Sequence, residues 1–373
     1  MHTNGEKGYI SADSHIYEPD DMWTTRMDKR FRDRAPHTQA LNDADYFCLD
    51  GLPPAPTVGI LGVAIQEKMA GEGEVTSVLR RNQDCRPGAW DPQARLADQD
   101  LDHVRAEVLY PGAGLLLFSI PDAEYQRECI RVYNDWLSDF CKAAPKRLIG
   151  TGLLPLRGPV EWAITEAERA ARIGMRGVMI PTDLVFHDPQ YQPLWTALQE
   201  LNLPVALHPG GALQFPFGEF TNIPTNAWVV ENKITPMLRS LSILLASAVP
   251  QQYPGLRFVI VEGGIGWMAA MLRFMDHWWE DHRKWLQPKL DEKPSYYFHR
   301  QVWATFEDDR AGMQTRDLLN VDHLMWGSDY PHTEGTFPRS QQQIAHDFVG
   351  VPETELCKIV WDNAAQLYAI TGA

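Results

Sequence analysis

Acidic and imidazole side chains stand in four short motifs that lie far apart along the chain. Asp13 and His15 share the first motif, DSH, and His208 follows in LHPGG. Glu262 lies in VEGG, and Asp329 lies in GSDYPH. Imidazole nitrogens and carboxylate oxygens are donors that bind Zn²⁺ and Mn²⁺ in proteins. If the fold brings these side chains together, the chemistry that they indicate is that of a bound divalent metal ion.

Each motif ends a short apolar run, and eight such runs are spaced along the chain. The runs are almost continuously apolar and are bounded by Gly or Pro, a pattern typical of parallel strands buried on both faces. We expect the strands at residues 8–15, 106–113, 147–156, 174–181, 204–210, 257–264, 301–308 and 323–331.

Segments with apolar residues at helical spacing lie between most of these strands. The clearest are residues 123–144, 161–173, 191–202, 232–249, 267–286 and 353–370. An alternation of strand and helix repeated eight times predicts an α/β fold, the (β/α)₈ or TIM barrel. A doubly wound parallel sheet is the alternative fold.

Residues 36–105 do not follow this alternation. They contain DGLPPAPTVG, a possible helix near residues 65–78, and DCRPGAWDP. We expect residues 1–373 to form a single barrel domain, in which residues 36–105 are an insertion after strand one that folds over the barrel mouth. This insertion would serve as a lid or as an oligomer contact, and the sequence does not decide between the two.

The polar motifs should meet at one end of such a barrel. Residues two apart in a strand face the same side, so Asp13 and His15 project together. Barrel enzymes place their chemistry at the carboxyl ends of the strands, where His208, Glu262 and Asp329 end strands five, six and eight. Taken alone, His208 could be a core residue and Asp329 or Asp13 a turn residue. Their shared position favours a metal site, because buried carboxylates require a counter-charge.

Composition narrows the classes of partner. The chain has 373 residues and a net charge of −15, which argues against nucleic acid and anionic membranes as partners. No apolar run approaches the length of a membrane span. The five cysteines are scattered without a C-x-x-C motif, which is typical of reduced thiols in a cytosolic protein. We therefore expect a cytoplasmic protein that acts on a small molecule.

These motifs resemble the amidohydrolase superfamily, and in particular the branch with aminocarboxymuconate-semialdehyde, resorcylate and carboxyvanillate decarboxylases. The resemblance implies a distorted (β/α)₈ barrel with one catalytic divalent ion, Zn²⁺ or Mn²⁺, bound by Asp13, His15, His208 and Asp329. Relatives with two ions bridge them by a Lys or Glu at the end of strand four. This chain has GVMIP there, with neither residue, which supports a single ion. The matching segments are DSHIYEP, RLADQDLDHVRAEVLYPG, LHPGG, VIVEGGIGW, MWGSDYPHTEG and DNAAQLY.

One position departs from the family pattern. Decarboxylases of this branch carry His at the end of strand six, where this chain has Glu262, and the resorcylate-type enzymes have Glu where it has Ile265. Glu262 could act as a general acid or base, or as a partner of His208. We expect Asp329, Glu262 and His208 to take part in catalysis. The reaction is either nonoxidative decarboxylation of an aromatic carboxylic acid or metal-dependent hydrolysis of a C–N, C–O or C–C bond, and the resemblance favours decarboxylation.

Candidate substrate contacts follow strand ends or lie in the insertion. An aromatic mouth would suit a planar substrate, although any one of these aromatic residues could instead belong to the core or to an interface. Arg81 could pair with a substrate carboxylate or be a surface residue. The candidates are Tyr17, Trp23, Arg81, Trp90, Tyr110, Trp228 and His332. Relatives also imply a homodimer or a higher homo-oligomer.

The sequence also allows two other classes of protein to be considered, a nucleotide-binding protein and a non-catalytic barrel. Gly264-x-Gly266-x-x-Ala269 follows an expected strand, as in a dinucleotide-binding fingerprint, but no acid closes a strand about 20 residues further on. A non-catalytic barrel would be expected to have lost ligands, and all four remain. The chain contains no G-x-S-x-G motif for a serine hydrolase.

Overall fold

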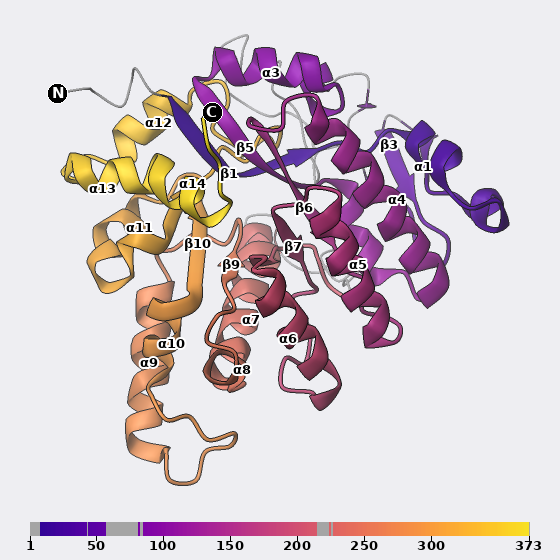
Figure 1. Cartoon of the computed structure of the whole chain (residues 1–373). Coiled ribbons are helices and arrows are strands. Elements are labelled where there is room, and N and C mark those ends of the chain that lie inside the picture. The colour runs from indigo at the N-terminus through magenta and orange to yellow at the C-terminus, as the bar shows by residue number, and fades with distance from the viewer. Residues whose placement is uncertain are drawn as a thin grey trace.

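Eight parallel strands form the centre of the molecule (Figure 1). The computed structural model describes residues 8–42, 44–56, 81–82, 85–214, 224 and 227–372. Every strand expected from the sequence is confirmed, and the strands pair in the order in which they occur along the chain. They are β1 (Tyr9–Ile16), β5 (Val104–Pro111), β6 (Leu148–Leu153), β7 (Gly177–Met179), β8 (Val205–Leu207), β9 (Phe258–Ile260), β10 (Val302–Phe306) and β11 (Leu324–Trp326).

The sheet closes on itself, which excludes the doubly wound alternative. The segment after β11 returns to β1, where the Asp329 amide donates to the Asp13 carbonyl at 2.9 Å. The His15 amide likewise donates to the Tyr330 carbonyl at 2.5 Å. Because the first strand thus bonds the segment that follows the last, the strands form a barrel, and their carboxyl ends share one rim.

Helices surround the barrel, as the order of elements and the first two figures show. The expected helices are confirmed, with two local differences. Residues 232–249 begin in a short π-helix, η9 (Val230–Ile234), that continues into α7, and residues 353–370 contain a second π-helix, η12 (Lys358–Asp362). The α-helices are α1 (Asp20–Arg26), α3 (Pro92–Leu101), α4 (Ala123–Lys142), α5 (Val160–Arg172), α6 (Gln192–Leu201), α7 (Thr235–Ala246), α8 (Val249–Gln252), α9 (Met268–His282), α10 (Pro294–Gln301), α11 (Arg310–Thr315), α12 (Ser340–Asp347), α13 (Glu353–Cys357) and α14 (Asn363–Leu367).

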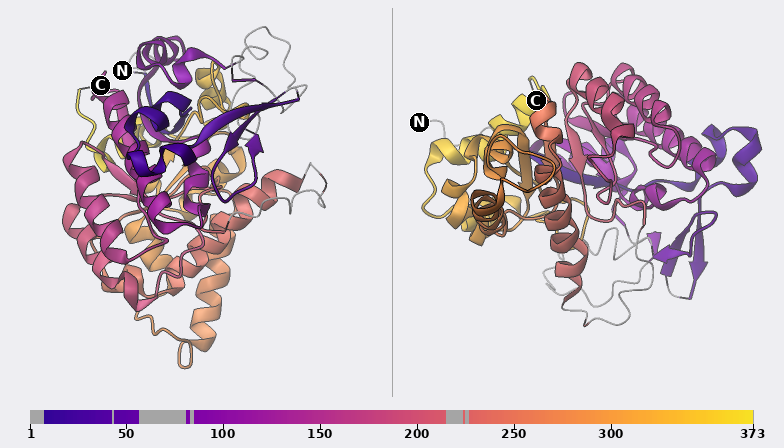
Figure 2. Two further views of the ribbon diagram at one scale, coloured as in Figure 1. Left: turned by 90° about the vertical axis from the view of Figure 1, so that its right-hand side faces the viewer. Right: turned by 90° about the horizontal axis from the view of Figure 1, so that it is seen from below.

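The segment between β1 and β5 adds structure outside the barrel. Its described part contains a small antiparallel sheet of β2 (His37–Leu41), β3 (Ala44–Cys48) and β4 (Ala55–Pro56), which Figure 2 shows beside the barrel. Short 3₁₀ turns flank it at η2 (Lys29–Arg34) and η4 (Pro87–Ala89). The helix expected near residues 65–78 lies outside the described residues. In the part of the chain that is described, no helix is both long and apolar enough to span a membrane.

The glycine-rich stretch after β9 is occupied by a protein carboxylate. Asp309 Oδ2 accepts hydrogen bonds from the backbone amides of Ile265 at 2.6 Å and of Gly266 at 2.8 Å. A dinucleotide site would offer such amides to phosphate. The negative charge that these amides bind here belongs to the chain itself, which counts against the nucleotide alternative.

A buried ion pair supports β1 from below the rim. The Arg95 side chain of α3 is fully buried, and its Nε donates to Glu107 Oε2 of β5 at 2.5 Å. Its Nη1 donates to the His15 carbonyl at 2.8 Å, and its guanidinium lies 4.2 Å from the centre of the Tyr330 ring. Ser14 donates to the other oxygen of Glu107 at 3.2 Å. The guanidinium of Arg95 thus connects β1, β5 and the segment after β11 that closes the barrel.

Substituting this arginine should destabilise the whole barrel. We expect Arg95→Met to lower the free energy of unfolding by about 3–5 kcal/mol, because Glu107 would remain buried without its counter-charge. Urea denaturation followed by circular dichroism measures the change. Arg30→Met is the matched control, since Arg30 pairs with Glu124 where both side chains are about two-thirds exposed and such pairs contribute little. Equal effects of the two substitutions would contradict this account of Arg95.

Candidate metal centre

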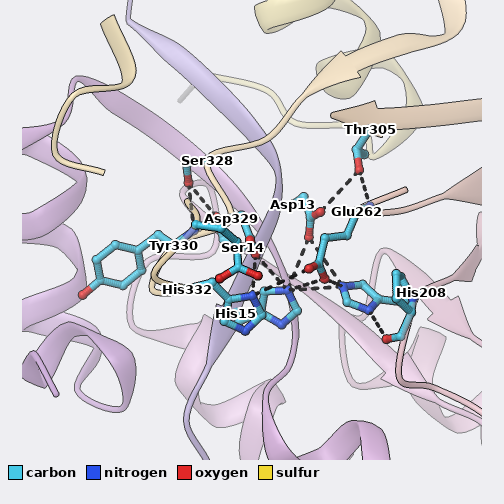
Figure 3. Close-up of polar contacts among 12 residues, drawn as sticks. Asp13, Ser14, His15, His208, Glu262, Thr305, Ser328, Asp329, Tyr330 and His332 are labelled. Atoms are coloured by element: carbon cyan, nitrogen blue, oxygen red, sulfur yellow. Dashed lines mark hydrogen bonds and ion pairs between the residues drawn. The ribbon is translucent and has the colours of Figure 1, made fainter. Parts of the chain in front are cut away.

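The polar motifs of the sequence meet at the carboxyl rim of the barrel (Figure 3). Asp13 and His15 lie on β1, and His208 directly follows β8. Glu262 follows β9, and Asp329 follows β11. Glu262 and Asp329 have φ angles of 54° and 55°. This left-handed backbone is uncommon for residues other than glycine, and such conformations cluster at functional sites.

The four expected ligands lie within a few ångströms of one another. His15 Nε2 is 3.2 Å from His208 Nε2, 3.3 Å from Asp329 Oδ1 and 3.7 Å from Asp13 Oδ1. His208 Nε2 is 3.9 Å from Asp13 Oδ1. All four side chains are buried. The structure therefore brings together the residues that the sequence places on strands one, five and eight.

In their neutral forms the two imidazoles direct acceptor nitrogens toward each other. His15 Nδ1 lies 2.7 Å from the Pro111 carbonyl, and His208 Nδ1 lies 2.7 Å from the Pro209 carbonyl. A carbonyl oxygen only accepts, so each Nδ1 must donate, which in a neutral imidazole leaves Nε2 as an acceptor. Two acceptors 3.2 Å apart repel unless a cation lies beside both. This arrangement, with Nδ1 held by a backbone carbonyl, is the one that metal-binding histidines adopt.

Buried carboxylate oxygens in the same place have no hydrogen bond. Asp13 Oδ1 and both carboxylate oxygens of Asp329 have no such partner among the described residues. His332 Nδ1 approaches Asp329 Oδ1 to 2.8 Å, yet neither atom makes a hydrogen bond. Burial raises the pKa of the Asp13 carboxyl well above its usual value, so its ionised form requires a nearby cation. The donor set fits one divalent ion, and His15, Glu262, Asp329 and His332 also form a possible ligand group.

The carboxylate of Glu262 lies between the two imidazoles of the expected ligands and the side chain of Lys233. Its Oε2 lies 2.8 Å from His208 Nε2 and 3.7 Å from His15 Nε2. Its Oε1 faces the other way and forms an ion pair with Lys233. Burial acts to raise the pKa of Glu262, but the ammonium of Lys233 and the imidazoles of His208 and His15 together outweigh it and hold that pKa well below its usual range. Glu262 is therefore a buried carboxylate in its ionised form.

Lys233 was missed in the sequence. Lys233 lies in the π-helix η9 and not at the end of a strand. The other residues of the site were predicted because each one ends a strand, and this criterion does not apply to Lys233. Its side chain is only 12% exposed, and its Nζ contacts Glu262, Glu334 Oε1 at 3.0 Å and Asp329 Oδ2 at 3.9 Å. The one available signal was a single basic residue in the turn before the apolar stretch of residues 234–249.

A pocket opens beside this cluster. Its polar end is formed by Lys233, Glu262, His332 and Glu334, while apolar side chains form much of the rest. His332 stacks on His15 with ring centres 4.0 Å apart. Of the expected substrate contacts, Trp228 and His332 line this pocket. Its remaining described lining consists of Ala55, Pro56, Leu115, Leu116, Pro209, Gly210 and Asn232.

Trp23 and Arg81, two other expected substrate contacts, lie away from this pocket, and the structure corrects these two expectations. Trp23 is fully buried and packs on Phe47 in the hydrophobic core. Arg81 binds Asp45 Oδ1 at 2.8 Å and the Ala44 carbonyl at 3.2 Å, so its charge is directed to the small sheet. Neither residue lines the pocket among the described residues.

Two tyrosines also lie outside that lining. Tyr17 packs on Trp90, and its hydroxyl is 3.3 Å from Thr38 Oγ1. Tyr110 is fully buried, with its ring centre 5.6 Å from that of His208 and its hydroxyl 3.1 Å from that of Tyr368. Tyr110 therefore packs against the His208 imidazole and directs its hydroxyl to Tyr368, not to the pocket.

Known proteins resemble this chain in sequence and in fold. A gamma-resorcylate decarboxylase of Rhodococcus jostii is 26% identical over 353 residues, which cover 83% of this chain and 98% of that protein. An amidohydrolase structure from Mycobacterium avium subsp. paratuberculosis has a TM-score of 0.74 at 20% identity, covering 97% of this chain and 99% of the other. A dihydroxybenzoic acid decarboxylase of a Polaromonas species, with bound manganese and 2-nitroresorcinol, has a TM-score of 0.65 at 18% identity, covering 98% of each chain.

The family comparison covers the barrel except for its first strand, β1, which carries Asp13 and His15. The amidohydrolase family model matches residues 21–370, a range that contains the segments carrying His208, Glu262 and Asp329. This chain belongs to the amidohydrolase family.

Proposed function

We propose that this protein is a metal-dependent decarboxylase of a hydroxyaromatic carboxylic acid, with Asp13, His15, His208 and Asp329 as the ligands of one divalent ion. The observation that carries the proposal is the buried pair of opposed imidazole nitrogens flanked by hydrogen-bond-free carboxylate oxygens, next to a pocket with an apolar wall. The names of the gamma-resorcylate decarboxylase relatives support the reaction. The manganese in a structural neighbour favours Mn²⁺ over Zn²⁺.

The reaction breaks the bond between the ring carbon and the carboxylate carbon. The electron pair of that bond stays on the ring carbon, which takes up a proton, and the carboxylate leaves as CO₂. The ion, when bound, supplies Lewis acidity that orients the carboxylate and a neighbouring hydroxyl. The residues of the chain must then exclude water from the ring, hold it in place and move one proton to it.

His332 and Asp329 are placed to handle that proton. His332 lines the pocket, its ring nitrogens make no hydrogen bond, and its Nδ1 is 2.8 Å from Asp329 Oδ1. Burial acts to raise the pKa of Asp329, but the charge of His332 contributes to lowering it to about 2. Asp329 is thus ionised and can accept a hydrogen bond from a substrate hydroxyl, and His332 can hold a proton at the ring side. Leu115, Leu116 and Trp228 in the pocket lining limit the access of water to the ring.

Hydrolysis of a C–N, C–O or C–C bond is the second candidate, and Glu262 is the observation that favours it. An ionised carboxylate 2.8 Å from a candidate ligand nitrogen is suited to take a proton from water. We place it second because the named relatives are decarboxylases. A homo-oligomer, a cytoplasmic location and a role of residues 36–105 over the barrel mouth stay predictions from the sequence. Ala55 and Pro56 in the pocket lining support the last of these.

Loss of a metal ligand should remove the ion and the activity together. We expect His208→Ala to lower metal affinity by more than the roughly 10- to 100-fold that loss of an outer partner costs, because a direct donor is removed. Elemental analysis of purified protein and a CO₂-release assay measure the two effects. His277→Ala, at a side chain 60% exposed on α9, is the control. Wild-type turnover after complete removal of metal would contradict the proposal.

The two candidate reactions can be separated by substrate panels. We expect CO₂ from at least one ortho-hydroxybenzoate, such as 2,6-dihydroxybenzoate, because an ortho-hydroxyl next to the carboxylate lets the site hold both groups. Manganese-loaded protein is assayed for CO₂ by coupled detection, in parallel with amide, ester and C–C hydrolysis panels. Activity in the hydrolysis panels, with no CO₂ from any hydroxyaryl acid, would replace decarboxylation with the second candidate.

A further inference from the structure

The pocket contains one nearly buried ammonium whose position is fixed by the chain. Lys233 extends from η9, the π-helical segment that continues directly into α7, and its side chain is 12% exposed. It is the one Lys or Arg among the described residues that line the pocket. An ammonium removed from water in this way must be balanced by negative charge. What balances it indicates what the pocket is built to bind.

Two carboxylates of very different exposure contact this ammonium. Glu262 is 5% exposed and belongs to the buried cluster. Glu334 is 44% exposed, lies in the segment after Asp329 and places Oε1 3.0 Å from Nζ. Asp329 Oδ2 lies further away, at 3.9 Å. The bond to Glu262 is therefore protected from water, whereas Glu334 can leave Nζ by moving into solvent at little cost.

Glu334 is the exposed partner of this ammonium. Lys233 keeps its ion pair with the buried Glu262 when Glu334 moves away. Glu334 also lies in the lining of the pocket. A substrate carboxylate could therefore replace it without leaving the ammonium unpaired.

We propose that Lys233 selects an anionic substrate by binding the substrate's carboxylate in exchange for the carboxylate of Glu334. This inference rests on the proposed function and specifies its substrate class as a planar acid ionised at neutral pH. Glu334 Oε1 marks the approximate position of one substrate oxygen, 3.0 Å from Nζ. Glu262 holds Lys233 in place from the buried side. The apolar wall of Leu115, Leu116 and Trp228 is then left for the ring.

The exchange predicts opposite effects for two substitutions. Manganese-loaded protein is mixed with 2,6-dihydroxybenzoate or with its uncharged amide, 2,6-dihydroxybenzamide, and stopped-flow tryptophan fluorescence follows binding before turnover. We expect Lys233→Met to weaken carboxylate binding roughly tenfold or more, as loss of a charged hydrogen bond does, and to change amide binding less than about twofold. Glu334→Gln should tighten carboxylate binding about threefold or more, because the competing charge is gone, and leave amide binding unchanged.

Two further variants separate this role from mere neutralisation of Glu262. Lys233→Arg should restore part of the preference for the carboxylate, and Lys233→Met combined with Glu262→Gln removes both charges of the pair without leaving one unpaired. Metal content is measured in each protein. If Lys233→Met does not fold, Glu334→Gln and the double variant still decide the matter. Equal weakening of acid and amide by loss of Lys233, or weaker acid binding in Glu334→Gln, would overturn the role of Lys233.

The wild-type protein distinguishes a failure of this inference from a failure of the proposed function. Wild-type protein that binds the acid and releases CO₂, while its variants lack the predicted pattern, would overturn the role of Lys233 and leave decarboxylation standing. Wild-type protein that binds neither probe and releases no CO₂ from any hydroxyaryl acid would overturn both. Tighter acid binding in Glu334→Gln together with selective loss in Lys233→Met would establish the exchange.

Discussion

Repulsion among buried acceptor atoms is the constraint on which the rim of this barrel depends. His15 Nε2 and His208 Nε2 face each other at 3.2 Å, and the hydrogen-bond-free oxygens of Asp13 and Asp329 lie beside them. Such an arrangement is unfavourable in a low-dielectric interior unless a cation lies among these atoms. Burial and the carboxylates Asp329 and Glu262 act in opposite directions on His15, and the carboxylates prevail, raising its pKa well above the usual value. Without an ion, a proton on His15 would take part of the cation's place.

The scaffold must resist that repulsion, which explains the rigid support around β1. Arg95 bonds the His15 carbonyl directly and pairs with Glu107 on the adjacent strand, so the backbone that carries two of the donors is held from below. The hydrogen bond from the Asp329 amide to the Asp13 carbonyl fixes the first and last strands to each other. Preorganised donors cost less to bring together when the ion binds, because the fold has already ordered them.

The sequence predicts the site residues that lie at strand ends. It does not predict residues whose position depends on three-dimensional packing. Asp13, His15, His208 and Asp329 could be assembled because each ends an apolar run, and all parallel strands of a barrel end at one rim. Lys233 could not be assembled in this way, since no periodic pattern indicates that a residue in a π-helical segment directs its side chain toward two strand ends. Trp23 and Arg81 illustrate the opposite error: their residue types suit a substrate, but one is covered by the core and the other binds Asp45.

The apolar wall links the charge arrangement to the choice between the two reactions. A carboxylate that enters a pocket lined by Leu115, Leu116 and Trp228 loses water, and it keeps only the contacts that the polar end supplies. Decarboxylation converts that desolvated anion into neutral CO₂, so a water-poor pocket opposes the reactant more than the product. Hydrolysis, in contrast, needs a water molecule held at the reacting carbon. Glu262 would favour holding one, but Lys233 already occupies its pocket-facing oxygen. Because this oxygen is engaged, Glu262 serves better as the fixed partner of an anion-binding ammonium than as a base for water.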